Sequence, residues 1–388
     1  MGNKIKVLQI SKRYPPYIGG IETTCCDISS FLESTNKYDV EVIAFNSTKK
    51  DVKEIIDGVT VYRVGVQKIV ASQPLAKNYG KILKKILVDF NPDIIHFHYP
   101  DPYAANYVLK YLKKLHYKGK FILHWHADII KQKLLKQLFV KQNKDLLNRA
   151  DIVIATSPSY LKDTDYLPYY KGNIEILPSC IGKERTILTE DIIKKSNEIK
   201  EEHKNKKICF FFGRHVEYKG LKYLIESNEY IDRDKVDIII GGSGPLTDEL
   251  KKQASKYNNI YFVGKLSEDD INSYLLACDI FTFPSITRNE AFGISLAEAM
   301  YFAKPTVTFT ILGSGVNWVS INNETGLEAQ NKNSKQYGEY IMKLVNDEEL
   351  YNKLSKGAKE RSEKLFSEKE FNENVISIYN KMNVVGDK

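Results

Sequence analysis

Short apolar runs alternate with amphipathic stretches through the first half of the chain. Helical spacing of apolar residues covers Ile21–Leu32 and roughly residues 76–90, 103–116, 129–148 and 157–166. Strands joined by helices form parallel sheets that are covered on both faces. The pattern therefore predicts an α/β unit whose ligands lie beyond the carboxyl ends of its strands. The predicted strands are Lys4–Ile10, Asp39–Phe45, Val59–Val64, Asp93–His98, Lys120–Trp125, Asp151–Ala155 and Ile174–Leu177.

The second half continues this alternation after a charged, helical stretch at 183–206, which we interpret as a linker extension. Its predicted strands are Lys207–Phe212, Val236–Ile240, Ile260–Val263, Asp279–Phe283 and Pro305–Phe309, and its last helices are Gln336–Val345, Glu348–Ser362 and Glu370–Met382. A chain of 388 residues is long enough for two domains that each bury a core. The sequence therefore predicts two α/β units, with a hinge that begins at Pro178.

The stretch Thr282–Tyr301 carries the strongest chemical pattern. It leaves a strand, crosses a polar loop and enters a helix at Phe292-Gly293-Ile294, with Gly293 expected in the first turn. A helix start presents free backbone N–H groups and the positive end of the helix dipole, which favours an anion. Glu290 precedes this start and Glu298 lies within the helix, so we expect Glu290 to bind a polyol and Glu298 a ribose. The alternative is an ordinary amphipathic helix after a strand.

Two other loops of the second half follow strands and carry candidate ligands. Arg214 and Lys219 flank a turn into a helix, where two fixed cations could neutralise a diphosphate without a metal. The alternative is a pair of solvated surface cations. Gly242 and Gly244 follow the next strand, where glycines let a flat ring or a phosphate approach the backbone.

Histidine pairs end two strands of the first half. His96 and His98 share one face of their strand by alternation, and so do His124 and His126. With Asp128 these four histidines could form a metal centre, although polar residues are common at the ends of parallel strands. We expect no metal here, and we interpret Asp163-Thr164-Asp165, which mimics a metal-binding D-x-D, as surface.

Paired glycines end the loop after the first strand. Gly19 and Gly20 stand between that strand and the helix Ile21–Leu32, which is how a chain brings its backbone close to a phosphate or a sugar. A plain strand-to-helix turn is the alternative. The spacing fits neither the Rossmann G-x-G-x-x-G motif nor a Walker loop.

Taken together, these motifs resemble the retaining glycosyltransferases of family four, which have the two-domain GT-B fold. Glu290-x7-Glu298 with Phe292-Gly293 between resembles the E-x7-E signature, and the spacing from Arg214 to Lys219 resembles the G-R-x4-K phosphate motif. Pro16 to Glu22 resembles the first loop, and Gly242-Ser243-Gly244-Pro245 fits the G-x-G-P form. His126 matches the histidine that ends the fifth strand and faces the reacting sugar.

The chain departs from this pattern at two places. Ser179-Cys180-Ile181-Gly182 replaces the Asn-Gly-Ile/Val-Asp that often follows the hinge proline, so no ligand is assigned there. Asn317 and Trp318 stand where many relatives have a glutamate, so backbone contacts are carried over only to Gly313 and Gly315.

The resemblance implies two Rossmann-like domains that face a central cleft. The first, at 1–180, would bind the acceptor and be completed by a C-terminal helix at about 368–385 that crosses back to it. The second, at 181–367, would bind the nucleotide-sugar donor. The implied catalytic residues are His126, Arg214, Lys219 and Glu290, and the donor-binding residues are Gly242, Gly244, Phe292, Gly293, Ile294 and Glu298. Gly19 and Gly20 would lie in the acceptor or phosphate loop.

The implied reaction is hexose transfer with retention at the anomeric carbon. The first-domain loops offer no clear carboxylate nucleophile, so a front-face displacement fits better than a covalent intermediate. Similarity around His124 to Lys133 to mannosyltransferases of surface-polysaccharide assembly favours GDP-mannose as donor. Three alternatives remain: a nucleotide-sugar epimerase of the same fold, a metal-dependent hydrolase using the histidines, and a non-catalytic nucleotide-sugar-binding protein.

Charge is unevenly distributed along the chain. The net charge is +8, but residues 1–180 carry 27 basic against 17 acidic side chains. The basic amphipathic stretch Ile129–Leu147 suits an anionic membrane surface and a lipid-linked saccharide acceptor. Recognition modules for nucleic acid are absent from the sequence, and no apolar run is long enough to span a bilayer. Five cysteines without C-x-x-C spacing suggest a reducing compartment, so we expect a cytoplasmic protein that can associate peripherally with a membrane.

Overall fold

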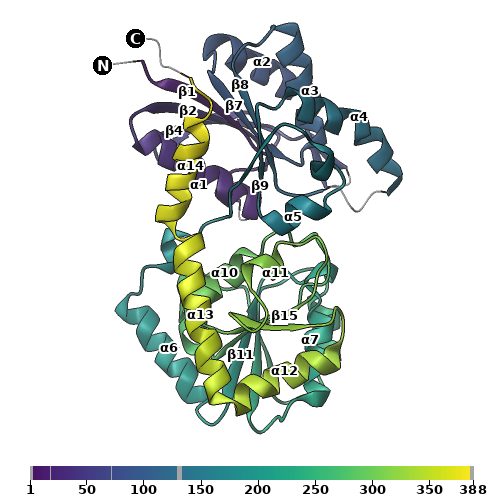
Figure 1. The fold of residues 1–388 in the computed structure, drawn as a ribbon, viewed down its shortest axis with the longest axis vertical. Coiled ribbons are helices and arrows are strands. Elements are labelled where there is room, and N and C mark those ends of the chain that lie inside the picture. Colours follow the sequence, from purple (N-terminus) through teal and green to yellow (C-terminus); the bar gives the residue numbers. More distant parts are fainter. Residues whose placement is uncertain (1–2, 18, 71, 129–132, 385–388) are drawn as a thin grey trace. The chain divides into compact units, whose positions relative to one another are not determined.

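The chain forms two compact units, which are described separately below. The computed structural model describes residues 3–17, 19–70, 72–128 and 133–384, with the backbone but not the side chains of residues 133–138, 163 and 169. The first unit contains Met1–Thr156, Thr164–Leu177 and Asn372–Lys388, and the second contains Ser157–Asp163 and Pro178–Phe371 (Figure 1). Among the described residues, no helix is both long and apolar enough to cross a membrane.

An eight-stranded sheet forms the centre of the first unit. Its strands are β1 (Ile5–Ile10), β2 (Tyr38–Phe45), β3 (Val52–Ile56), β4 (Val59–Val64), β7 (Ile94–Tyr99), β8 (Lys120–Trp125), β9 (Ile152–Ala155) and β10 (Asn173–Ile176). They lie in the order β10-β9-β8-β7-β1-β2-β4-β3, and every neighbouring pair is parallel except β3 with β4. A separate antiparallel pair is formed by β5 (Lys68–Val70) and β6 (Gln73–Leu75).

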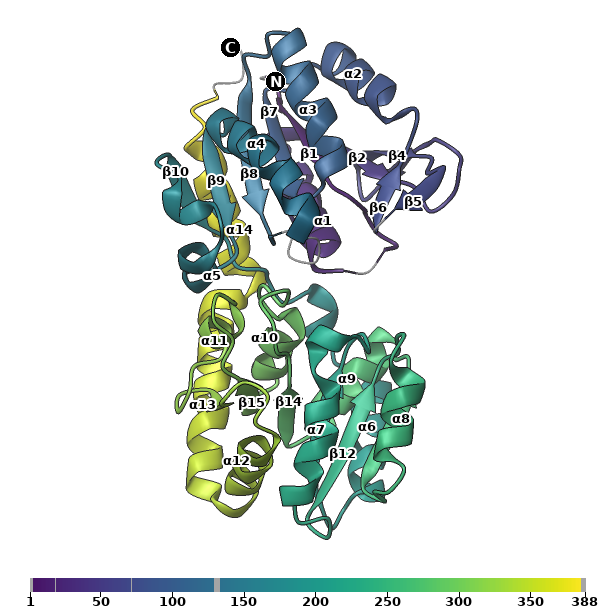
Figure 2. The same cartoon turned by 90° about the vertical axis from the view of Figure 1, so that its right-hand side faces the viewer.

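Helices cover both faces of this sheet, which is why its central strands are almost wholly buried. They are α1 (Gly20–Ser34), α2 (Tyr79–Asp89), α3 (Pro102–Lys114), α4 (Lys133–Arg149), α14 (Glu368–Asn380) and the 3-10 helix η1 (Leu167–Tyr169). α1 and α14 lie on one face, and α2, α3 and α4 lie on the other (Figures 1 and 2). Local chemistry fixes their ends: Asp101 caps α3 by accepting from Ala104 N at 3.1 Å, and Pro102 occupies the first turn.

The second unit has a six-stranded, fully parallel sheet. Its strands are β11 (Lys207–Phe212), β12 (Val236–Gly241), β13 (Ile260–Gly264), β14 (Ile280–Phe283), β15 (Thr306–Phe309) and β16 (Gly326–Ala329). The order is β13-β12-β11-β14-β15-β16, so the β11–β14 pair lies at the point where the strand order reverses. In open α/β sheets this reversal point is where ligands bind.

Two apolar clusters, one on each face, hold the helices of the second unit to this sheet. One cluster includes α7 (Leu221–Ser227), α8 (Thr247–Ala254) and α12 (Ser334–Asn346). The other includes α6 (Glu190–Glu202), α9 (Glu268–Ala277), α10 (Ile294–Tyr301), α11 (Val316–Val319) and α13 (Glu348–Phe366). The remaining helices are α5 (Pro158–Asp163) and the 3-10 helices η2 (Lys183–Arg185), η3 (Glu217–Lys219) and η4 (Asn228–Tyr230).

The structure differs from the sequence-based expectation at several places. β3, β5, β6 and β16 were not predicted; β3 is an edge strand whose Ile55 is 73% exposed, so it lacks the buried pattern of the others. The stretch 183–206 is helical only in η2 and α6. Ser157–Asp163 packs with the second unit, through α5 against α11, although the expected boundary is at residue 180. The predicted basic helix Ile129–Leu147 falls partly on residues 129–132, which lie outside the described residues.

Candidate active site

The loops after β11 and β14 carry the candidate donor site and are joined to each other. Ile286 N donates to Tyr218 O at 2.9 Å, which ties the loop that follows β14 to the loop that follows β11. Lys219 forms an ion pair with Glu290 through Nζ and Oε2, and Ser285 Oγ donates to the same carboxylate at 3.2 Å. Two predicted site residues that are 71 positions apart in the chain are thus in direct contact.

The Lys219–Glu290 pair is largely shielded from water. Lys219 is 9% exposed and its Nζ lies 4.9 Å from the centroid of the Phe283 ring. Removing one partner of such a pair leaves a poorly solvated charge, so the two side chains depend on each other. Arg214, by contrast, is exposed on the same loop. The structure therefore offers one cation engaged by a carboxylate and one that is open to solvent.

The helix start behind this pair is formed by α10. Gly293 is its N-cap residue, with a φ of 93° that favours glycine, and it was expected instead within the first turn. The helix itself begins at Ile294, and Phe292 packs against Phe366 with ring centroids 5.4 Å apart. The apolar anchor before the cap holds the backbone of Phe292, Gly293 and Ile294 at the edge of the sheet.

The loop between β15 and α11 contacts the segment that precedes this helix start. Gly315 N donates to Ala291 O at 2.9 Å, and Ser314 Oγ donates to the carbonyl oxygen of Glu290. These bonds hold the segment that carries Glu290. Gly315, to which a backbone ligand contact was assigned on resemblance, therefore has a supporting role in the structure.

Glu298 is buried in α10 and has a partner that the sequence did not reveal. Arg185 Nε donates to its Oε1 at 3.0 Å, and the same guanidinium contacts Glu268 Oε2 at 2.5 Å and Asn272 Oδ1 at 3.2 Å. Burial raises the pKa of Glu298 to about 7, and the positive charge of Arg185 opposes this rise. Arg185 lies in η2, within a charged stretch interpreted as a linker, and no spacing or flanking motif distinguishes it there.

Gly242 and Gly244 have a structural reason for being glycines. A Cβ at Gly242, whose φ is 107°, would overlap the carbonyl oxygen of Gly213, and one at Gly244 would overlap that of His215. The two loops are held together by bonds from Gly213 N to Gly241 O at 3.2 Å and from His215 N to Ser243 O at 3.1 Å. Close loop-to-loop packing, rather than approach of a ligand, occupies the space that the missing side chains leave.

His96, His98, His124 and His126 of the first unit form one buried cluster. His98 Nδ1 lies 2.9 Å from His126 Nε2, and His98 Nε2 lies 3.0 Å from Gln9 Oε1. His96 Nδ1 bonds to the hydroxyl of Tyr379 at 2.8 Å, whereas neither ring nitrogen of His124 has a partner. Burial lowers the pKa of His96 and of His126 to about 3 each, so the rings are neutral at pH 7.

The ring geometry does not fit a metal ion. His96, His98 and His124 bring one nitrogen each within 4.8 Å of one another. Two of the three ring pairs are stacked, however: His96 lies 13° from parallel with His98 and 19° from parallel with His124, and His98 and His124 are tilted by 32°. Lone pairs lie in the ring planes, so parallel rings cannot direct three of them at one tetrahedral centre. Asp128 instead accepts from Trp125 Nε1 at 2.9 Å and from Asp165 N at 3.3 Å.

Gly19 and Gly20 stand at the start of α1, as the sequence predicted. Gly19 is the N-cap residue and has extended backbone, and it provides no side-chain cap for the helix. Thr23 N donates to Gly19 O at 2.9 Å, and Ile18 before it lies outside the described residues. The first turn of α1 carries the acidic residue Glu22.

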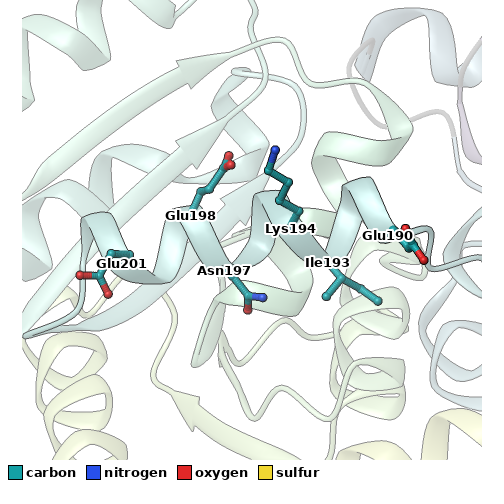
Figure 3. Close-up of a pocket in the computed structure, with 6 residues that line it drawn as sticks. All are labelled: Glu190, Ile193, Lys194, Asn197, Glu198 and Glu201. Carbon is teal, nitrogen blue, oxygen red and sulfur yellow. The ribbon is translucent and has the colours of Figure 1, made fainter.

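A separate hollow on α6 is not a candidate for this chemistry. Figure 3 shows that the side chains that line it all come from one helix: Glu190, Ile193, Lys194, Asn197, Glu198 and Glu201. None of them is a predicted site residue, and a single exposed helix face does not bring ligands together from different elements. The candidate site therefore remains at the strand ends described above.

Comparison with known proteins identifies the family. Residues 192–361 match the family model described as "Glycosyl transferases group 1", and residues 18–185 match the model described as "Glycosyltransferase Family 4". The O-antigen chain mannosyltransferase C of Escherichia coli is 27% identical over 97% of this chain and 98% of its own. The D-rhamnosyltransferase WbpZ of Pseudomonas aeruginosa is 26% identical over 94% of this chain and 92% of its own.

A solved structure agrees with the fold. HepE of Anabaena, in complex with UDP and glucose, superposes with a TM-score of 0.76 at 16% identity, and the match covers 97% of this chain and 99% of that one. This likeness and the two predominantly parallel sheets confirm the predicted α/β fold class, GT-B. The family models together cover most of the sequence. The chain therefore belongs to the family-four, group 1 glycosyltransferases, as the Glu290-x7-Glu298 motif predicted.

Proposed function

We propose that this glycosyltransferase moves a hexose from a nucleotide-sugar to a saccharide acceptor in cell-surface glycan synthesis and retains the anomeric configuration. The observation that carries the proposal is the contact between Lys219 and Glu290, three residues before the N-cap of α10. A cation, a carboxylate and a helix start within one pair of loops are ligands for a diphosphate and for a sugar hydroxyl.

The donor diphosphate would be bound by positive charge from three sources. Arg214 presents an exposed guanidinium, Lys219 presents an ammonium, and the start of α10 presents the backbone N–H groups of Phe292, Gly293 and Ile294. Two side-chain cations match the two negative charges that the donor diphosphate already carries, and the helix start can stabilise the further charge that develops as the bond to the sugar breaks. This balance supports a transfer that needs no metal ion.

The two carboxylates would bind the two sugars of the donor. Glu290 would hold a hydroxyl of the transferred hexose while Lys219 turns from it to the phosphate. Glu298 would accept from a ribose hydroxyl through Oε2, because Oε1 is already engaged by Arg185. Gly242 and Gly244, which pack beside Gly213 and His215, would shape the wall next to the nucleotide.

Transfer would proceed on one face of the sugar. The bond from the anomeric carbon to the phosphate oxygen breaks as the acceptor oxygen attacks from the same side, and the acceptor proton passes to the departing phosphate. His126 would contact the reacting sugar, and the Gly19-Gly20 loop at the start of α1 would bind the acceptor or its phosphate.

The donor is proposed to be GDP-mannose and the acceptor a lipid-linked saccharide. The first is supported by the name of the Escherichia coli relative, a mannosyltransferase, whereas HepE was solved with UDP and glucose. The second is supported by the excess of basic residues in the first 180 positions. The nucleotide-sugar panel below decides between GDP and UDP donors.

The test is incubation of the full chain with GDP-, UDP-, ADP- and dTDP-sugars, with and without EDTA and with a membrane extract as acceptor. We expect release of one nucleoside diphosphate, transfer that survives EDTA, and a product whose anomeric proton coupling matches the donor. Conversion of the donor sugar without an acceptor would instead identify an epimerase. Activity that EDTA abolishes and Zn²⁺ restores would favour the hydrolase alternative.

A further inference from the structure

A chain of hydrogen bonds runs through the core of the first unit and ends at His126. It begins at Tyr379 of α14, whose hydroxyl accepts from Gln9 Nε2 at 2.9 Å. Gln9 Oε1 faces His98 Nε2 at 3.0 Å, and His98 Nδ1 faces His126 Nε2 at 2.9 Å. These hydrogen bonds thus link a helix near the C-terminus to the ends of β1, β7 and β8.

Counting the protons along this series of hydrogen bonds fixes the tautomers of His98 and His126. A neutral imidazole carries one N–H, and an amide oxygen can only accept. His98 must therefore donate from Nε2 to Gln9 Oε1, which leaves Nδ1 as an acceptor. His126 then donates from Nε2, and its own Nδ1 carries a free lone pair. Tyr379 uses its single O–H to donate to His96 Nδ1 at 2.8 Å, which is consistent with its accepting from Gln9.

The connection is specific for His126. Gln9, His96 and His124 are fully buried, whereas 5% of the surface of His126 is exposed to solvent. His124 lies on the same strand face with neither nitrogen bonded, so the core does not simply satisfy every histidine. Among the described residues, no hydrogen bond to Nδ1 of His126 is found, so this nitrogen is the end of the chain.

We propose that Gln9, His98 and Tyr379 are positioning residues that hold His126 in the tautomer with its proton on Nε2. Nδ1 then accepts a hydrogen bond from a hydroxyl of the sugar or the acceptor, and it cannot donate one. The identity of that ligand rests on the proposed function, whereas the tautomer does not. The rival is the reverse chain, obtained by turning the Gln9 amide, which puts the proton on Nδ1.

The first test measures the tautomer directly. The full chain is labelled with ¹⁵N-histidine, and long-range ¹H–¹⁵N correlation spectra are recorded at pH 7, with His126→Gln used to assign the ring. We expect a protonated Nε2 and a bare Nδ1 for His126. A protonated Nδ1 would overturn the proposal, even if the protein proved to be an active transferase.

The second test interrupts the series of hydrogen bonds at two residues, Gln9 and Tyr379. Gln9→Leu removes the acceptor for His98 and should mix the tautomers of His126, whereas Gln9→Glu keeps an oxygen there and should restore one tautomer. Tyr379→Phe keeps the ring packing but removes the hydroxyl that accepts the hydrogen bond from Gln9 Nε2. Both Gln9→Leu and Tyr379→Phe should lower kcat about tenfold and leave nucleotide affinity unchanged, as expected for one misdirected hydrogen bond.

A matched control separates positioning from loss of stability. Tyr337 of the second unit also buries its hydroxyl, which donates to Val307 O at 2.6 Å. Tyr337→Phe should lower the melting temperature as much as Tyr379→Phe does, without change in kcat or in the His126 spectrum. Equal effects of the two variants on kcat would show that the network is only structural. If Gln9→Leu fails to fold, the spectrum of the unaltered chain still decides.

Discussion

At the scale of single residues, the two cations of the proposed donor site differ in what surrounds them. Arg214 is exposed, whereas Lys219 is largely buried against Glu290 and the Phe283 ring. A charge-assisted contact to a diphosphate is worth about 1.5–3 kcal/mol. Arg214→Ala and Lys219→Ala should therefore each lower kcat/KM about a hundredfold, as steady-state kinetics with the nucleotide-sugar would measure.

Stability separates the two variants. Arg214→Ala should leave the free energy of unfolding unchanged, but Lys219→Ala strands the carboxylate of Glu290 and should cost about 1–3 kcal/mol. Adding Glu290→Gln to Lys219→Ala should recover stability without recovering activity. A similar loss of stability in Arg214→Ala would contradict the assigned difference in surroundings, and loss of activity in EDTA would contradict the role of the cations.

Neutralising Glu298 and neutralising Glu290 should affect different steps, nucleotide binding and sugar transfer respectively. Glu298→Gln should weaken binding of the free nucleoside diphosphate about tenfold, and Glu290→Gln should spare that binding while reducing transfer. Because the pKa of Glu298 is raised to about 7, affinity for the nucleotide should rise as the pH increases through that value. Isothermal titration across this range measures it, with Glu298→Gln as the pH-insensitive control. Equal loss of affinity in both variants would show that the roles are misassigned.

At the scale of elements, β7, β8 and the residue that follows β8 place four neutral histidines in the core of the first unit. The pKa of His96 and of His126 is about 3 in the folded protein, against 6.5 for an exposed ring. Below pH 6.5 the unfolded chain therefore binds protons that the folded chain does not. The free energy of unfolding should fall as the pH decreases from 6.5 towards 3, by up to about 1.4 kcal/mol per pH unit for each ring.

Denaturant titrations at pH 7 and pH 5 test this dependence. His124→Leu removes a buried ring with two unpaired nitrogens, so it should stabilise the protein at pH 5. It should also reduce the slope of the free energy of unfolding against pH by the contribution of one histidine. His116→Asn, at an exposed turn after α3, is the matched control and should leave the slope unchanged. A stability that does not change between the two pH values would mean that these rings are not buried as neutral groups.

Apolar patterning made the central elements predictable, and long-range contacts explain what was missed. β8 and β11 have the predicted bounds because both faces of each strand are largely buried and most of their residues are apolar. β3 escaped prediction because an exposed edge strand has no such run. Glu290, Arg214 and Lys219 stood out by their positions after strands. Arg185 and Gln9 did not, since their partners lie 113 and 370 residues away in the chain.

At the scale of the whole molecule, charge is concentrated in the first half of the sequence. Residues 1–180 carry 27 basic and 17 acidic side chains, although the net charge of the chain is only +8. α4 is amphipathic as predicted in its described part: Lys141 and Lys144 are exposed, and Leu146 and Leu147 are buried. The side chains of its first turns lie outside the described residues, so the full extent of the basic face remains a prediction.

Sedimentation with lipid vesicles tests whether this charge holds the protein at a membrane. Each lysine near an anionic leaflet contributes about 1 kcal/mol, so Lys133, Lys136 and Lys141 together should allow reversible binding that needs anionic lipid and weakens with salt. Changing all three to glutamate should abolish it. The matched control makes the same charge change at Lys204, Lys335 and Lys356, which are exposed in the second unit, and should bind normally. Equal loss in both triple variants would indicate attraction by net charge alone, and no binding by the unaltered chain at low salt would favour a soluble acceptor.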